Sequence, residues 1–254
     1  MPDPRPPALI ARIGTAYSPS FFQNRDDALR SARAAVPAIL ECVRPASVVD
    51  VGCGVGSWLK AFQENGVGDF LGIDGDYVDP DWLAIPREKF QAADLSKPLP
   101  LPRAFDLVLS LEVAEHLPTS AADTFVDSLV GLGPVILFSA AIPLQGGNAH
   151  VNEQWQDYWA AKFEGRGYVV VDALREKLWS QSEVNYFYAQ NALFYVRSER
   201  LKDYPVLSAA REKTRRSQLN VVHPKQFLAS ARPLAKIVSM VPGPLRRIGR
   251  KIFA

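Results

Sequence analysis

The sequence predicts an α/β domain built on a mainly parallel β-sheet. Short apolar runs alternate along the chain with helical segments, which is the order that right-handed βαβ crossovers produce. Two further apolar runs, separated by a loop, follow the last of these units. We expect strands at about residues 47–51, 69–74, 89–93, 105–110, 134–139, 168–172 and 184–197.

The chain of 254 residues is long enough to bury one sizeable core and needs no second domain. Residues 1–25 are rich in proline and carry only Phe21 and Phe22 as an apolar anchor, so we expect a flexible lead there. An amphipathic helix should follow over residues 26–44. The α/β domain should then occupy residues 26–200, and residues 201–254 should form a basic C-terminal extension.

A glycine-rich loop after the first strand is the most specific signal in the chain. Residues 48–59, VVDVGCGVGSWL, pass from an apolar strand through Gly52, Gly54 and Gly56 into the start of a helix. Glycine allows positive φ and removes Cβ atoms, so backbone N–H groups and the helix N-terminus can approach a polar ligand. The spacing is G-x-G-x-G and position 57 is Ser, which disfavours the pyrophosphate of a dinucleotide.

Three further signals follow at the ends of later strands. The second strand, FLGID, ends in Asp74, a carboxylate suited to accept hydrogen bonds from ribose hydroxyls. The third, within FQAADL, ends at Asp94. The fourth, FDLVLS, opens directly into LEVAEHLP, which carries Glu112, Glu115 and His116. Carboxyl ends of parallel strands meet at one edge of a sheet, so these groups should converge there.

In this order and spacing, residues 45–197 resemble the class I S-adenosylmethionine-dependent methyltransferases. Those proteins carry D-x-G-x-G-x-G, an acidic residue closing the second strand, an Asp after the third strand and a catalytic-face loop after the fourth. The resemblance implies a Rossmann-like seven-stranded sheet with helices on both faces and a terminal antiparallel hairpin. It also implies S-adenosyl-L-methionine as the methyl donor.

The resemblance assigns the donor contacts by region. The first strand and glycine loop would line the methionine portion, the end of the second strand would hold the ribose, the end of the third would contact the adenine, and the end of the fourth would border the sulfonium. The cofactor-binding residues so implied are Asp50, Gly52, Cys53, Gly54, Gly56, Asp74, Gly75, Asp94, Leu95, Ser110 and Leu111. The simpler alternatives are that Asp50 caps the loop and that Asp94 is a turn residue.

Glu112, Glu115 and His116 would lie on one face of a helix, if this segment begins one, because they are spaced i, i+3 and i+4. The loop QGGNAHVNEQW after the fifth strand, residues 145–155, should bring His150 over the same edge. E-x-x-E-H with a later His is similar to the metal-binding arrangement of small-RNA 3′-end 2′-O-methyltransferases and, less completely, of ubiquinone-pathway O-methyltransferases. That likeness predicts Mg²⁺ or Mn²⁺ bound by Glu112, Glu115, His116 and His150.

The same residues also allow catalysis without a metal. His150 could act as general base, with His116 and Glu112 as further catalytic groups. Alternatively, Glu115 could cap the turn and His116 could pack in the core or act as a base, as the E-H pair does in metal-free relatives. A base or a metal suits a hydroxyl acceptor, so we expect O-methylation of a small molecule, sugar or glycan precursor. A noncatalytic S-adenosylmethionine-binding protein is the alternative. A nicotinamide-dependent oxidoreductase is disfavoured by the glycine spacing.

Later aromatic and amide residues are ambiguous from sequence. Trp155, Tyr158 and Trp159 have helical spacing, which favours packing of a helix against the sheet, with Trp155 as an alternative wall of the acceptor pocket. We place Tyr186, Tyr188, Gln190 and Asn191 on the last strand.

Charge is distributed unevenly along the chain. From Arg211 onward eleven Lys and Arg face the single acid Glu212, a net charge of +10, so the total of +2 leaves residues 1–210 at −8. An acidic body argues against a nucleic acid lying across the catalytic face, unless the basic tail recruits it. Residues 228–254 interleave basic and apolar side chains and could form a helix that lies on an anionic membrane surface. A solvated helix or a segment that docks on a protein are the alternatives.

The sequence shows no secretion signal and no apolar run near the roughly 20 residues of a spanning helix, so we expect a cytoplasmic protein. If the basic extension binds lipid, the protein would be peripheral to the inner face of the membrane. A disulfide between Cys42 and Cys53 would strain the glycine loop, so we expect both thiols to stay unpaired.

Overall fold

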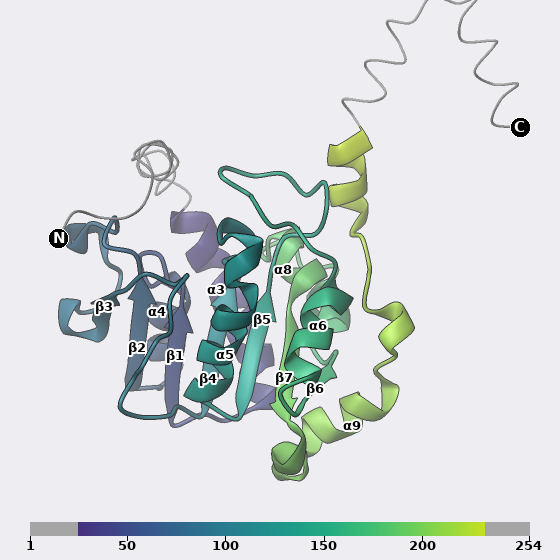
Figure 1. Ribbon diagram of the computed structural model, residues 1–254, viewed down its shortest axis with the longest axis horizontal. Helices are drawn as coiled ribbons and strands as arrows, with labels where there is room; N and C mark the ends of the chain where they lie inside the picture. The colour runs from purple at the N-terminus through teal and green to yellow at the C-terminus, as the bar shows by residue number, and fades with distance from the viewer. Residues whose placement is uncertain (1–24, 232–254) are drawn as a thin grey trace, which may run out of the picture.

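The computed structural model describes residues 25–231, which form one α/β body around a central sheet (Figure 1). Within this range the sheet has seven strands in the order β3-β2-β1-β4-β5-β7-β6. The strands are β1 Ser47–Val51, β2 Asp69–Asp74, β3 Phe90–Ala92, β4 Leu107–Leu111, β5 Val135–Ser139, β6 Tyr168–Val171 and β7 Leu193–Arg197. The expectations for the first six strands are therefore confirmed to within about two residues.

Helices cover both faces of this sheet. They are α3 Arg25–Cys42, α4 Ser57–Glu64, α5 Ala122–Leu132, α6 Gln156–Glu164, α7 Arg175–Leu178, α8 Tyr186–Asn191 and α9 Pro205–Lys213. A last helix begins at Pro224 and continues to the end of the described residues. The prediction of a helix near residues 26–44 is confirmed by α3.

The strand pairing fixes where a ligand can bind. β1 pairs in parallel with β2 on one side and with β4 on the other, so the strand order reverses between β1 and β4. β7 lies antiparallel to both β5 and β6, which confirms the predicted terminal hairpin. In open α/β sheets the crevice at such a reversal, at the carboxyl ends of the strands, is the usual ligand site.

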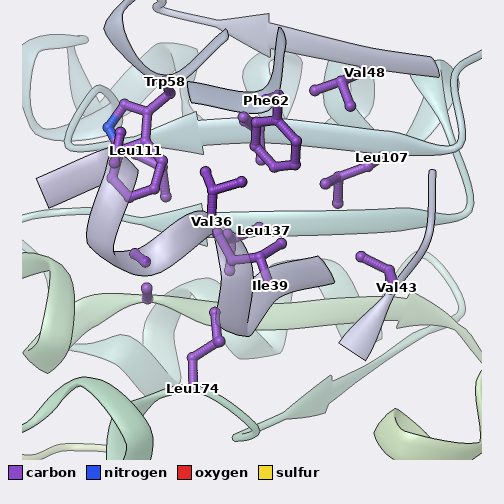
Figure 2. Close-up of a cluster of buried hydrophobic side chains, with 14 of the residues drawn as sticks. Val36, Ile39, Val43, Val48, Trp58, Phe62, Leu107, Leu111, Leu137 and Leu174 are labelled. Carbon is purple, nitrogen blue, oxygen red and sulfur yellow. The ribbon is translucent and has the colours of Figure 1, made fainter. Parts of the chain in front are cut away.

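Two apolar clusters hold the helices onto the sheet. On one face Val36 and Ile39 of α3 and Phe62 of α4 pack over Leu107 and Leu137 of the central strands (Figure 2). On the other face, α5 and α6 bury Phe125, Trp159 and Phe163 against β4 and β5. Trp159 is buried with its ring 5.2 Å from that of Phe138, which confirms the packing interpretation for this residue.

The prediction of one strand over residues 184–197 is wrong in its first half. Residues Tyr186–Asn191 form α8, and only Leu193–Arg197 form the strand β7. Tyr and Phe have high strand propensity, but propensity is a weak guide where tertiary contacts decide. Tyr186, Tyr188, Gln190 and Asn191 therefore lie on a short helix instead of on the last strand.

The C-terminal extension packs on the body as far as it is described. Leu207 of α9 and Leu219 after it are fully buried. The Arg175 guanidinium donates to the carbonyl oxygens of Leu219, at 2.6 Å, and Gln218. The predicted lead, except for Arg25, and the predicted basic helix beyond Ala231 lie outside the described residues.

Cys42 and Cys53 are both buried and unpaired. Among the helices that the structure describes, none combines the length and the apolar character needed to cross a bilayer.

Candidate active site at the carboxyl edge of the sheet

The glycine loop has the backbone conformation that its sequence predicts. Gly52, Gly54 and Gly56 have φ of 88°, 53° and 84°. A Cβ on Gly52 would lie 2.3 Å from Cγ2 of Val113, so glycine is also required there by close approach. Gly56 stands at the N-cap of α4, which therefore begins at the carboxyl end of β1. The N–H groups of Gly52 and Cys53 donate to the carbonyl oxygen of Ile73, at 2.7 and 3.1 Å, so the loop is fixed against β2. Its glycines let a ligand approach the backbone closely at the predicted edge.

Asp74 lies at the end of β2 with its carboxylate facing the glycine loop. One oxygen accepts a hydrogen bond from the N–H of Gly54 at 2.6 Å, and the other accepts from the N–H of Gly75 at 2.6 Å and from the hydroxyl of Tyr77 at 2.5 Å. Burial raises the pKa of Asp74, and these donors oppose the rise. This carboxylate therefore holds the loop and the chain after β2 together.

Asp50, near the end of β1, is a second buried carboxyl group beside Asp74. Burial and the charge of Asp74 raise the pKa of Asp50 to about 7. Its Oδ2 atom has no hydrogen-bond partner among the described residues. An unsatisfied buried carboxylate is costly and favours a cationic or hydrogen-bond-donating ligand nearby.

A cavity of about 520 Å³ opens between the glycine loop, the chain after β4, the loop after β5 and α8. That volume is typical of a small-molecule site. Its lining residues include Gly52, Cys53, Gly54, Val55, Ser57, Trp58, Leu111, Glu112, Glu115, His116, Gln145, His150, Tyr186, Phe187 and Tyr188. The amino-terminal turn of α3 contributes Asp27 and Ala28.

Several predicted donor contacts do not line this cavity. Asp50, Gly56, Asp74, Gly75, Asp94, Leu95 and Ser110 lie outside its lining. The carboxylate of Asp94 accepts from the N–H and hydroxyl of Ser96, at 3.1 and 2.6 Å, which is the geometry of a turn residue. Leu95 and Ser110 are buried within the body.

Glu112 marks the point where β4 ends. Its φ is 56°, a left-handed conformation that is uncommon for a residue with a side chain. Its N–H donates to the carbonyl oxygen of Ser139 at 3.0 Å. The segment that follows, Ala114–His116, is a single turn of 3₁₀ helix, so the expected α-helical face is wrong. The three predicted groups still reach the cavity, because the sharp turn at Glu112 redirects the chain.

Glu115, His116 and His150 come together as a cluster. One potential ligand atom from each of them lies within 4.8 Å of the other two. The rings of His116 and His150 meet edge to face, with centroids 4.9 Å apart. The N–H groups of Val151 and Asn152 donate to the carbonyl oxygen of Glu115 at 2.8 and 3.0 Å. These bonds fix the loop after β5 onto the turn that carries Glu115 and His116.

Glu153 orders the same loop from within. Its carboxylate accepts from the N–H groups of Leu144 and Gly146, both at 2.8 Å, and lies 2.9 Å from Nδ1 of His150. When Nδ1 carries the proton, Nε2 of His150 keeps its lone pair for a metal ion or a proton. The sequence places Glu153 in this loop but does not indicate that its carboxylate orients His150.

Burial sets the charge state of the cluster. It raises the pKa of Glu115 well above the usual range, and the charge of Glu112 raises it further. Neither oxygen of Glu115 makes a well-oriented hydrogen bond within the described residues. Burial and His150 lower the pKa of His116 to about 4, against a backbone hydrogen bond to Ala149. Near neutral pH, His116 is therefore uncharged, which is the state that binds metal ions.

The carboxylate of Glu112 is held by amides instead of joining this cluster. Gln145 Nε2 donates to Oε2 at 2.6 Å and Asn191 Nδ2 donates to Oε1 at 3.1 Å. Burial raises the pKa of Glu112 to about 7, and these donors oppose the rise. Gln190 donates to Gln145 and Asn191, and it accepts from the N–H of His223 at 2.7 Å. A hydrogen-bonded path thus joins Glu112 to the C-terminal extension.

The sequence profile of a family described as "Methyltransferase domain" matches residues 21–179, which is more than half of the chain. The chain belongs to this methyltransferase family. Its sheet, with the reversal at β1 and β4 and the antiparallel β7, has the topology of the class I S-adenosylmethionine-dependent members. The resemblance seen in the sequence is confirmed.

Many solved structures resemble this methyltransferase domain distantly, and three of them illustrate the likeness. Magnesium protoporphyrin IX methyltransferase (ChlM) of Synechocystis PCC 6803, solved with bound SAH, has 20% identity, covering 76% of this chain and 95% of that one, with a TM-score of 0.49. The methyltransferase domain of bacterial CtHen1 has 19% identity, with coverage of 66% and 97% and a TM-score of 0.46. DesVI of Streptomyces venezuelae has 16% identity, with coverage of 72% and 98% and a TM-score of 0.47. No curated protein matches the chain.

In this methyltransferase domain, sequence reasoning located Glu112, Glu115, His116 and His150 at one cavity, and the structure brings all four there. It missed Asn191, because that residue was assigned to a strand. Gln145 was recognised only as part of a loop, and its contact with Glu112 depends on how that loop folds back. The sequence did carry a signal for Glu153, because it is a carboxylate only three residues after His150 in the loop after β5.

Proposed function

We propose that the protein transfers a methyl group from S-adenosyl-L-methionine to a hydroxyl oxygen of a small molecule, sugar or glycan precursor. The observation that carries the proposal is the cluster of Glu115, His116 and His150 on the same cavity as the glycine loop. Groups able to bind a cation or take a proton suit a hydroxyl acceptor, which must lose its proton during transfer. A cytosolic location remains part of the proposal and agrees with two unpaired buried thiols.

The residues around the glycine loop fit the donor. Gly52, Cys53 and Gly54 line the cavity, and close packing excludes a side chain at position 52. The unsatisfied oxygen of Asp50 would favour a ligand that carries an ammonium group, as the methionine portion does. A carboxylate can accept about four hydrogen bonds, so Asp74, which accepts three, keeps capacity for a ribose hydroxyl.

The residues of the cluster also fit a divalent cation. One carboxylate and two imidazoles form a mixed donor set that suits Mn²⁺ and, with water, Mg²⁺. In the structure these three ligand atoms lie within 4.8 Å of one another. If each atom moved by under about 1 Å toward their common centre, all three could bind one ion at roughly 2.1 Å. Such an ion would supply Lewis-acid polarisation of the acceptor hydroxyl. Glu115, His116 and His150 would hold it, with Glu112 beside them.

The chain's own groups perform three tasks in this reaction. The glycine loop and the turn at Glu112 hold the donor and acceptor in line, as a displacement at a methyl carbon requires. Nε2 of His150, oriented by Glu153 at its other nitrogen, is placed to bind a cation or accept the hydroxyl proton. Tyr186, Phe187 and Trp58 give the cavity an apolar wall that reduces the water around the reacting atoms.

The first experiment is isothermal titration of the protein with S-adenosylhomocysteine, with and without Mg²⁺ or Mn²⁺, and with NADH as a control ligand. We expect stoichiometric binding of the homocysteine product and none of NADH. Binding of NADH alone would reverse the donor assignment in favour of an oxidoreductase.

Methyl transfer is then assayed with labelled S-adenosylmethionine on sugars, phenols and simple diols. Turnover that rises with Mg²⁺ or Mn²⁺ and disappears on chelation supports the metal cluster. Turnover that chelation leaves unchanged supports His150 as a base. Donor binding without methylation of any acceptor favours the noncatalytic binding protein.

A further inference from the structure

Most of the large apolar side chains that are exposed in residues 25–231 lie in two short segments of the chain. Seven large hydrophobic residues are exposed within the described part of the chain, and six of them fall in two short segments. We call these six the apolar rim: Leu144, Val151, Trp155, Val222, Phe227 and Leu228. Leu144 is 77% exposed and Phe227 is 64% exposed, so these side chains point into solvent and are not partly covered core residues. The seventh, Val206, lies on α9.

Hydrogen bonds join the two segments into one surface. The carbonyl oxygen of Leu144 accepts from Nε2 of Gln226 and from the hydroxyl of Ser230, both at 2.9 Å. Gln156, next to Trp155, donates to the carbonyl oxygen of Val221 at 3.3 Å. Figure 1 shows the loop after β5 and the yellow helix that begins at Pro224 together at the upper edge of the view, with α9 at the lower edge.

The apolar rim continues directly into the cavity. The residues between Leu144 and Val151 include Gln145, Gly147 and His150, which line the cavity. Leu144 and Val151 therefore lie at the two ends of the segment that forms one side of the cavity mouth. Whatever covers the rim lies beside the opening.

The sequence that carries this surface and follows it is basic. Lys225 lies on the helix that carries Phe227 and Leu228, and residues 232–254 follow it directly with six Lys or Arg and no Asp or Glu. The nearest acid on the loop, Glu153, is already bonded to Leu144, Gly146 and His150. Exposed apolar side chains beside a run of cationic residues match an anionic lipid surface, which offers both apolar depth and negative charge.

We propose that the apolar rim, together with Lys225, seats the protein on an anionic lipid bilayer with the cavity mouth beside the membrane surface. Leu144, Phe227 and Leu228 enter the interface. Lys225 contacts lipid head groups. The surface is independent of the chemistry in the cavity, so it can be tested without a known acceptor.

The test is flotation of the full-length protein with vesicles of phosphatidylcholine alone or with one third phosphatidylglycerol. We expect binding to the anionic vesicles, weaker binding in high salt, and little binding to the neutral ones. The combined variant Leu144→Ser, Phe227→Ser, Leu228→Ser should reduce the partition coefficient by about tenfold or more, because three apolar groups no longer enter the interface. Val206→Ser, an exposed apolar residue on α9, is the matched control and should bind like the unmodified chain.

Titration with S-adenosylhomocysteine is run on every variant. A rim variant that binds this ligand normally is folded, so its loss of vesicle binding supports the surface. Equal vesicle binding by the rim variant and the unmodified chain would overturn the proposal. Failure of the unmodified chain to bind anionic vesicles while it binds S-adenosylhomocysteine would overturn the surface and leave the proposed function standing.

Two other occupants would be recognised in the same samples. Concentration-dependent dimerisation that the rim variant abolishes would identify a second copy of the chain as the occupant and overturn the lipid assignment. Binding to an RNA or DNA oligonucleotide that competes with the vesicles would overturn it in favour of nucleic acid. Quenching of tryptophan fluorescence by brominated lipid, lost in Trp155→Phe, would support the orientation with the rim against the bilayer.

Discussion

The rings of His116 and His150 meet edge to face beside Glu115, although they come from segments that follow different strands. His116 lies on the turn after β4 and His150 in the loop after β5, and backbone bonds from Val151 and Asn152 to Glu115 hold the two segments together. A cluster assembled from two loops by such specific contacts has a fixed geometry, which is what a metal centre or a positioned base requires.

His150→Ala should lower turnover by at least about a hundredfold, since a base or metal ligand contributes an effect of that order. Affinity for S-adenosylhomocysteine should be retained, because the donor contacts lie on the glycine loop. Titration with Mn²⁺ and a methylation assay check the two properties separately. His223→Ala is the control: this His is buried outside the cavity and bonds to the Trp179 carbonyl oxygen, so its loss should affect stability and not Mn²⁺ affinity. Full activity of His150→Ala would remove the residue from the reaction.

Gly147→Ala should displace His150. A Cβ at this position would lie 2.3 Å from Nε2 of His150, and Glu153 holds the opposite side of the ring. The ring has to move, so we expect turnover to fall by roughly tenfold or more, as small misplacements at reacting centres do. Gly131→Ala on α5 is the control, since no atom lies within 4 Å of a Cβ there and the position does not have a positive φ. Equal activity of the two variants would contradict the close fit of Gly147 to His150.

Asp50 should make the stability of the ligand-free protein depend on pH. Its pKa in the folded state, about 7, lies above its ordinary value of 3.8, so between these values the folded protein binds more protons than the unfolded chain. The contribution of Asp50 to the free energy of unfolding is therefore fully present below about pH 4, and this contribution is lost as the pH rises through about 7. Asp50→Asn should remove this loss and stabilise the ligand-free protein at pH 8 by roughly 1–3 kcal/mol.

Urea unfolding of both proteins at pH 5 to 8 measures this difference. The two curves of unfolding free energy against pH should diverge as pH rises. Parallel curves would mean that Asp50 ionises without penalty. The same substitution should weaken binding of S-adenosylhomocysteine, because the amide lacks the charge that would attract an ammonium group.

Asp74→Ala should weaken donor binding severely, by about a hundredfold or more, since it removes a carboxylate that can accept ribose hydroxyls. It also releases the N–H of Gly54, which this carboxylate holds at 2.6 Å. Asp76→Ala is the matched control, because Asp76 is exposed two residues later. Titration with S-adenosylhomocysteine compares them. Unchanged affinity in Asp74→Ala would overturn its assignment to the ribose.

The sequence predicted most of the fold because the signals it carries are local. Apolar strand runs such as VVDV, and glycines that need positive φ, are properties of a few neighbouring residues. The positions of Glu115, His116 and His150 followed from the rule that parallel strands end at one edge. Asn191 could not be placed, since its contact with Glu112 spans 79 residues of sequence and depends on α8, a helix with strand-forming residues. The turn at Glu112 was also unpredictable, because its positive φ belongs to a residue that rarely adopts it.

The amides around Glu112 lead to the last prediction. Asn191 donates to Oε1 of Glu112 and to Gln145, whose own amide donates to the other oxygen of Glu112. Asn191→Leu removes one donor and leaves Gln145 less well held, so the carboxylate can turn away from the position it now keeps. We expect turnover to fall by about tenfold or more, with donor affinity nearly unchanged.

Tyr186→Phe is the control on the same helix, because its hydroxyl bonds to Gln226 and not to Glu112 and because phenylalanine keeps the aromatic ring that lines the cavity. Thermal unfolding of both variants separates lost stability from lost positioning. If Asn191→Leu and Tyr186→Phe have the same kcat, the amide contact does not position Glu112 for the reaction. If Asn191→Gln recovers part of the activity that Asn191→Leu loses, the donated hydrogen bond, and not the volume of the side chain, is what the site requires.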